Sequence, residues 1–168
     1  YTKGTIDKGY ANRTLHIDVG TRTVTEKPVT DEMKSIFTGG KGFGLWLMWN
    51  SIPPQCAWDD PRNDIVINTG PLCGTPIYPG SGKSLVTAIS PLTGSVIDSN
   101  VGGYFGPYLK MAGFDSVEIQ GKSDVPVVVV IDGDEGKISF HEADGLSDDA
   151  YELSLALHER FGGDKPIK

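Results

Sequence analysis

The sequence predicts an α+β domain with mainly antiparallel β-sheets and a few helices, and three features of the chain indicate this class. Short alternating or continuous apolar stretches, typical of strands, outnumber the helical patterns. The strands come in runs separated by single helices, whereas a parallel α/β fold alternates strand and helix. Glycine makes up 22 of the 168 residues, roughly twice its average share of about 7%. Because this excess follows no repeat period, it belongs to turns and close contacts.

The first elements are expected to be a β-hairpin and a short helix. Thr14–Val19 alternates apolar and polar residues, as a strand with one buried face does, and a turn at residues 20–21 leads into a second strand, Arg22–Thr25. His16 falls on the polar phase of the first strand, so we expect it at the surface. Thr30 suits a helix N-cap because acidic residues and then one apolar side follow it.

A glycine-rich turn at residues 38–44 precedes the apolar helical stretch Leu45–Trp49. Such a turn leaves backbone N–H groups unpaired at the positive end of a helix, an arrangement that favours anions, and Lys41 adds a positive charge. The glycine spacing does not match G-x-G-x-x-G, so the turn does not predict a dinucleotide site.

A buried-looking strand, Asp64–Thr69, leads into residues 69–115, around which the chain is organised. Glycine or proline recurs there every few residues, as it does where the backbone turns repeatedly or another surface must approach it. A flat, phosphate-bearing cofactor is one such surface, and structural turns are the alternative. Within this stretch we expect strands at Leu85–Ile89 and Ser95–Asp98 and a helix at Tyr104–Met111, closed by Gly113.

The rest of the chain predicts three strands and a last helix. The strands are expected at Asp115–Gln120, Val125–Ile131 and Lys137–His141, the last two joined by a turn at residues 132–136. Ser147 is the expected cap of a helix that ends at residues 162–163 and has one apolar stripe, formed by Ala150, Leu153, Leu157 and Phe161. We expect one domain over residues 1–168, since this length suffices for a single core and is short for two.

Composition narrows the possible functions. The net charge of −7 repels polyanions and argues against nucleic-acid binding. No apolar run approaches the roughly 18 residues of a membrane span, and the first residues form no secretory signal, so a cytoplasmic protein is expected. Cys56 and Cys73 form no C-x-x-C pair, and Cys73 is expected to be a small buried thiol.

The sequence holds no self-contained catalytic set. Gly82-Lys83-Ser84 resembles the end of a P-loop, but the required earlier glycine is replaced by Ile77, and nearby prolines remove N–H groups. Neither a G-x-S-x-G elbow nor a His-x-x-x-His metal pair is present, and the acidic turn at residues 132–135 lacks the EF-hand pattern. Any chemistry therefore belongs to a cofactor.

Several glycine-rich motifs together resemble one family. By order and spacing over nearly the whole chain, they are similar to the amino-terminal domain of the tungsten-containing aldehyde:ferredoxin oxidoreductases. The motifs lie at residues 39–42 (Gly-Gly-Lys-Gly), 69–75 (Thr-Gly-Pro-Leu-Cys-Gly-Thr), 90–94 (Ser-Pro-Leu-Thr-Gly), 100–106 (Asn-Val-Gly-Gly-Tyr-Phe-Gly) and 109–115 (Leu-Lys-Met-Ala-Gly-Phe-Asp).

The resemblance implies that this domain forms the base for a tungsten, or less commonly molybdenum, bis-pyranopterin cofactor. It places a ligand to the magnesium ion between the two pterin phosphates on Asn100, and further cofactor contacts on Gly102, Gly103 and Tyr104. Lys83 stands where the family usually has an arginine between the pterin and a 4Fe-4S cluster, and lysine lacks the planar fork of arginine. The cluster itself is ligated outside this chain.

The resemblance further implies oxidation of aldehydes to carboxylic acids, with ferredoxin as electron acceptor. Family members are several times longer, so we expect a domain truncated at its C-terminal end, acting with the remaining domains or subunits, and a homodimer is one expected assembly. Cys73 stands where many relatives have threonine, which also resembles the benzoyl-coenzyme A reductase branch. Two other functions stay open, a non-catalytic scaffold of the same fold and a nucleotide-phosphate binder that uses residues 39–44.

Overall fold

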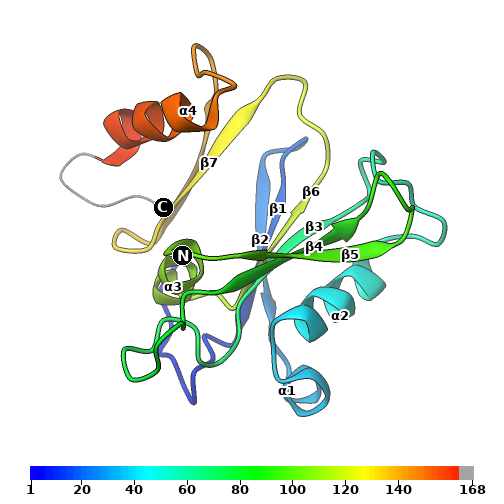
Figure 1. The fold of residues 1–168 in the computed structure, drawn as a ribbon, viewed down its shortest axis with the longest axis vertical. Coiled ribbons are helices and arrows are strands. Elements are labelled where there is room, and N and C mark those ends of the chain that lie inside the picture. The colour runs from blue at the N-terminus through cyan, green and yellow to red at the C-terminus, as the bar shows by residue number, and fades with distance from the viewer. Residues whose placement is uncertain (163–168) are drawn as a thin grey trace.

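A six-stranded mixed sheet lies at the centre of the structure, a computed structural model that describes residues 1–162 (Figure 1). Its strands follow the spatial order β2-β1-β6-β3-β4-β5. All neighbours are antiparallel except β1 and β6, which run parallel. The strands are β1 (Arg13–Asp18), β2 (Thr23–Pro28), β3 (Ile65–Asn68), β4 (Ser84–Ile89), β5 (Val96–Val101) and β6 (Ser116–Gln120).

A separate antiparallel hairpin, β7 (Val127–Asp132) and β8 (Lys137–Glu142), stands beside the sheet. Four α-helices complete residues 1–162, the last of them continued by a π-helical turn, η1 (His158–Gly162). The helices are α1 (Asp31–Phe37), α2 (Lys41–Ser51), α3 (Phe105–Ala112) and α4 (Ala150–Leu157). The predicted α+β class with mainly antiparallel sheets is confirmed.

Local chemistry explains where most helices begin and end. The Thr30 hydroxyl accepts a hydrogen bond from the Met33 N–H (3.2 Å) and caps α1, as predicted. Gly113 adopts a left-handed conformation (φ 101°) and ends α3, also as predicted. The glycine turn before α2 is shorter than predicted, because the helix already begins at Lys41.

The predicted cap of α4 is wrong. Asp149 caps this helix, since its carboxylate accepts from the N–H groups of Tyr151 (2.9 Å) and Glu152 (3.1 Å). The Ser147 hydroxyl instead donates to the Glu152 carboxylate (2.7 Å). A carboxylate binds the N–H groups and also offsets the positive helix end, so Asp149 is the stronger cap. The predicted end of this helix at residue 163 lies outside the described residues.

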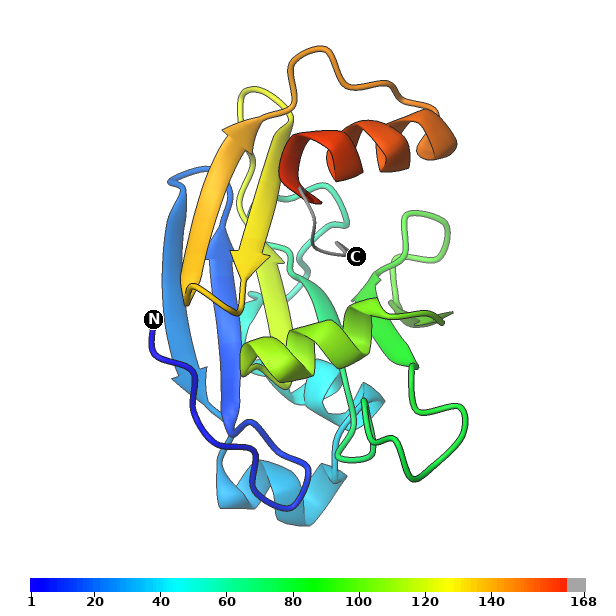
Figure 2. The ribbon, with the colours of Figure 1, turned by 90° about the vertical axis from the view of Figure 1, so that its left-hand side faces the viewer.

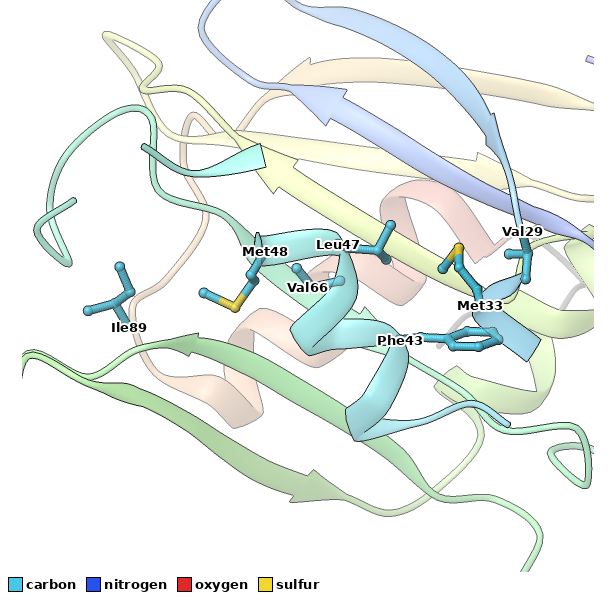
Figure 3. Close-up of a cluster of buried hydrophobic side chains, with 7 residues drawn as sticks. All are labelled: Val29, Met33, Phe43, Leu47, Met48, Val66 and Ile89. Carbon is cyan, nitrogen blue, oxygen red and sulfur yellow. The ribbon is translucent and has the colours of Figure 1, made fainter. Parts of the chain in front are cut away.

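Two apolar cores lie on opposite faces of the sheet. One packs under α1 and α2 and contains Val29, Met33, Phe43, Leu47, Met48, Val66 and Ile89 (Figure 3). The other consists of Leu15, Ile17, Leu109, Ala112, Phe114 and Val117, with partly buried residues of the hairpin packed against it. Figure 2 shows α3 and the hairpin together on this second face. The central strands are therefore covered on both faces, and several of their polar residues are buried, whereas the edge strands β2 and β5 are mostly exposed.

The helix-covered face of β1 and β6 is polar and yet buried, which corrects the expectation of a solvated face there. Thr14 is fully buried and His16 is half-buried. Glu118, opposite His16 in the parallel ladder, is fully buried and accepts from Lys27 Nζ (2.9 Å). Asp64 is fully buried as well and accepts from the Ser51 hydroxyl, while its Oδ1 has no partner among the described residues.

Asp64→Asn is expected to stabilise the fold at neutral pH and to weaken its pH dependence. Burial raises the pKa of the Asp64 carboxyl, so the folded state binds a proton more tightly than the unfolded state does. The protonated Asp64 carboxyl therefore stabilises the fold. This stabilisation is fully present at a pH below the pKa of Asp64 in the unfolded chain, and it is lost as the pH rises through the pKa of Asp64 in the folded protein. Urea unfolding from acid to neutral pH should give the variant a higher free energy of unfolding at neutral pH, by about 1.4 kcal/mol for each unit of pKa shift.

Asp144→Asn is the control, because Asp144 is exposed in the loop after β8 and its replacement should leave both the stability and its pH dependence unchanged. If the free energy of unfolding changes with pH in the same way for the parent protein and for Asp64→Asn, the buried Asp64 charge does not destabilise the fold at neutral pH, and the prediction is contradicted.

Candidate functional site

A hollow of about 380 Å³ opens where the glycine-rich segment passes the ends of the central strands. Its wall comes from residues within 38–40, 68–73 and 78–85 and from Asn100. These stretches are distant in sequence, but they meet because β3, β4 and β5 are neighbours in the sheet. The hollow thus brings together the turn before α2, the loop after β3 and the end of β5.

Two predicted site residues, Lys83 and Asn100, both line this hollow. Lys83 directly precedes β4 and is exposed, and no carboxylate among residues 1–162 forms an ion pair with it. Asn100 lies in β5 opposite Leu85, another residue of the wall. The predicted strand at 95–98 continues to Val101, so Asn100 is held by a strand and not by a loop.

The glycines beside the hollow face open space. A Cβ atom added to Gly70, Gly80, Gly102 or Gly103 would meet nothing within 4 Å among the described residues. Gly103 has a positive φ of 103°, which L-residues rarely adopt. At Gly82, by contrast, an added Cβ would strike the carbonyl oxygen of Gly103, so the two glycine-rich segments touch there. This contact sets Lys83 beside the predicted cofactor residues Gly102 and Gly103.

Tyr104 is the N-cap residue of α3 and is 64% exposed. Its ring lies 6.3 Å from that of Tyr108, measured between ring centroids. No side chain caps the helix, so the first turn of α3 directs backbone N–H groups toward residues 102–104. The positive end of the helix dipole there favours an anion.

The glycines at residues 39–44 have a packing role instead. A Cβ on Gly42 would lie 2.5 Å from Phe37 Cβ, and one on Gly44 would lie 2.5 Å from Asn68 Nδ2. The Gly40 N–H donates to the Thr69 carbonyl (2.9 Å). Close packing of α2 against α1 at Gly42 and against the sheet at Gly44 explains these glycines, so the structure gives no support to a nucleotide site built on them.

Cys73 also borders the hollow and is buried, as predicted. Its thiol donates a weak bond to the Lys83 carbonyl (3.7 Å), and burial raises its pKa. A buried thiol with a raised pKa is a poor nucleophile and metal ligand.

Sequence reasoning missed several residues of the wall. Asn68, Gly70 and Tyr78 line the hollow, but only the strand pairing that joins β3 to β4 shows that they belong there. Within residues 1–162, no group of three or more His, Cys, Asp and Glu side chains could hold a metal ion. No helix in the same range is long and apolar enough to cross a membrane.

Within residues 1–162, the structure is thus an α+β domain whose backbone is open at Gly70, Gly80, Gly102 and Gly103. Residues 14–168 match the family model described as the aldehyde ferredoxin oxidoreductase N-terminal domain. The chain therefore belongs to the aldehyde ferredoxin oxidoreductase family, as the motifs predicted.

The relatives include long oxidoreductases. The chain is 35% identical over 130 residues to the tungsten-containing aldehyde ferredoxin oxidoreductase of Pyrococcus horikoshii, covering 77% of the chain and 21% of the relative. It is 37% identical over 123 residues to the enzyme of the same name from Pyrococcus abyssi, covering 73% and 20%. The chain thus spans about a fifth of the length of these relatives.

Among solved structures, the chain is similar to the active site complex BamBC of benzoyl coenzyme A reductase in complex with 1,5 dienoyl-CoA. The TM-score is 0.85 at 26% identity, and the match covers 90% of this chain and 23% of the other.

Gly44→Ala should destabilise the fold, whereas Gly102→Ala should leave its stability almost unchanged. The Gly44 methyl group would overlap Thr87 and Asn68, so we expect a loss of about 1–3 kcal/mol in the free energy of unfolding. The Gly102 methyl group would enter open space, so we expect no more than about 0.5 kcal/mol. Urea unfolding measures both, and equal destabilisation by the two substitutions would contradict the division between packed and open glycines.

Proposed function

We propose that this chain is the cofactor-cradling domain of a tungsten, or molybdenum, pterin oxidoreductase that converts aldehydes to carboxylic acids. Family membership and the names of the tungsten-containing relatives support the class of enzyme. The observation that carries the proposal is the open backbone at Gly102 and Gly103, next to the hollow that Lys83 and Asn100 line.

The residues of the chain fit a flat, anionic group. Gly102 and Gly103 leave space where side chains would otherwise stand, and the uncapped start of α3 follows directly. The ammonium group of Lys83, which has no ion-pair partner among residues 1–162, supplies a positive charge at the same place, in a chain whose net charge is −7. Backbone N–H groups at a helix start together with a lysine are a usual arrangement for phosphate.

We assign the roles as follows. The amide oxygen of Asn100 would hold a magnesium ion of the cofactor, since magnesium prefers hard oxygen ligands. The N–H groups near Gly102 and Gly103 bind phosphate, Tyr104 contacts the cofactor, and Lys83 offsets negative charge on the side of a 4Fe-4S cluster ligated outside this chain. Tungsten, when bound, supplies the two-electron redox chemistry of the reaction.

In the overall reaction, an aldehyde and water give a carboxylic acid, two protons and two electrons. We propose that ferredoxin accepts the electrons. The hollow contains no His, Asp or Glu side chain among residues 1–162, so proton transfer at the substrate falls to the remaining domains or subunits. The contribution of this chain is to bind and orient the cofactor.

A second candidate is a reductase of the benzoyl-coenzyme A type. The similarity to the BamBC complex and the cysteine at position 73 favour it. Both candidates use this chain in the same way, as the base for the cofactor, and they differ in the substrate bound by other parts of the protein. Turnover assays with aldehydes and with benzoyl-coenzyme A separate them.

Asn100→Ala should lower the tungsten and magnesium content of the complete protein by about tenfold or more, because a metal ligand and its orienting groups are lost together. Inductively coupled plasma mass spectrometry of purified protein measures both metals. Asn50→Ala is the matched control, since Asn50 is exposed on α2 and bonds only its own helix, at the Trp46 carbonyl.

Unchanged tungsten and magnesium in Asn100→Ala, with the control also unchanged, would contradict the role of Asn100 and count against the proposed function.

A further inference from the structure

A second charged pair stands at the edge of the hollow. Lys41 directly follows Gly40, a residue of the wall, and its Nζ lies 2.5 Å from Asp98 Oδ1. Asp98 in turn lies two residues before Asn100 in β5. The ion pair therefore lies next to Asn100, the residue to which we assign the magnesium ion.

Strand register shows that Asp98 and Asn100 project from the same face of the sheet. Asp98 is opposite Thr87 and Asn100 is opposite Leu85. Both of these partners face α2, since Thr87 lies against Gly44 and Leu85 lies 3.6 Å from the Cβ position of Gly40. Alternate residues of a strand share a face, so the two side chains stand next to each other on the α2 side.

Lys41 occupies a position that is unfavourable for a cation. It is the first residue of α2, whose first turn contains no acidic residue and whose N-cap Gly40 makes no side-chain bond. The positive end of a helix disfavours a lysine and favours an anion. The Asp98 carboxylate is the anion now near this helix end, so an anionic group of a ligand can take the same place.

An unsatisfied acceptor lies in the same wall. Asn68 is fully buried and lines the hollow, and its Oδ1 has no hydrogen-bond partner among the described residues. A buried amide oxygen without a partner costs free energy. A cation, or a water molecule bound to one, satisfies such an oxygen.

We propose that the Lys41–Asp98 pair is exchanged when the magnesium and phosphate end of the cofactor binds, an inference that rests on the proposed function. The Asp98 carboxylate becomes a second oxygen ligand of magnesium beside Asn100, and the Lys41 ammonium group binds a phosphate oxygen. The Asp-x-Asn spacing suits one metal ion, because carboxylate and amide oxygens two residues apart on one face converge. Lys41 is exposed and Asp98 is half-buried, and a pair that water still reaches on one side contributes little to stability, so breaking it costs little free energy.

A charge-swapped variant of the complete protein, Lys41→Asp with Asp98→Lys, tests this proposal. The swap keeps an ion pair at the same place, so a merely structural pair is preserved, but it removes the proposed metal ligand and the proposed phosphate contact. We expect the magnesium that remains per tungsten after dialysis against a chelator to fall at least tenfold, measured by inductively coupled plasma mass spectrometry. Asp98→Ala alone, which leaves no side-chain oxygen at this position, should produce the same loss of magnesium.

Asp31→Asn is the control, because it breaks the ion pair that the exposed Asp31 forms with Lys34 on α1, and neither of these residues lines the hollow. Magnesium retained at the parental level in both the swapped variant and Asp98→Ala would overturn the exchange. If Asn100→Ala loses both metals in the same experiment, the proposed function survives that result. If the parent protein contains neither tungsten nor molybdenum, the proposed function fails, and the exchange fails with it.

Discussion

The ion pair between Lys110 and Asp115 is the interaction on which the rest of the structure depends. Both side chains are almost fully buried, and the Lys110 ammonium group also donates to the Gly9 carbonyl (3.0 Å). The Asp115 carboxylate accepts from the N–H groups of Ala11 (3.0 Å) and Asn12 (2.7 Å), and its carbonyl accepts from both the N–H and the hydroxyl of Thr69. One residue thus joins the start of β1, the end of α3 and the exit of β3. Because a buried charge is costly without its partner, these elements are held in one arrangement.

This arrangement determines the geometry of the site. Thr69 is the last residue before the glycine-rich loop, and its carbonyl also accepts the Gly40 N–H that starts α2. The other end of α3 begins beside the open glycines at 102 and 103. The starts of two helices and the loop between β3 and β4 are therefore positioned by a few buried hydrogen bonds. A rigid base of this kind is what a large, flat cofactor needs, since its own binding then costs little ordering of the protein.

Local signals predicted much of the fold, and pairing between distant strands explains what they missed. The hairpin, the Thr30 cap and the Gly113 terminus depend on neighbouring residues and were confirmed. The parallel pairing of β1 with β6 and the complete burial of Thr14 depend on contacts across the sheet, which periodicity does not encode. At the site, motifs indicated Lys83 and Asn100, whereas the closeness of Asp98 to Asn100 follows from strand register and that of Lys41 to Asp98 from the packing of α2 on the sheet. Glycine counts alone also could not separate the packed glycines of α2 from the open ones.

The central claim is that residues 100–104 and the neighbouring hollow seat a metal-bearing pterin cofactor. The most direct measurement is an anomalous-scattering map at the tungsten and molybdenum absorption edges, from crystals of the complete protein purified from its native source. We predict one heavy-metal peak on the side of the domain where the hollow opens, with phosphate density against Gly102 and Gly103. Absence of any tungsten or molybdenum peak, with polypeptide packed over residues 100–104, would contradict the account and favour the non-catalytic scaffold.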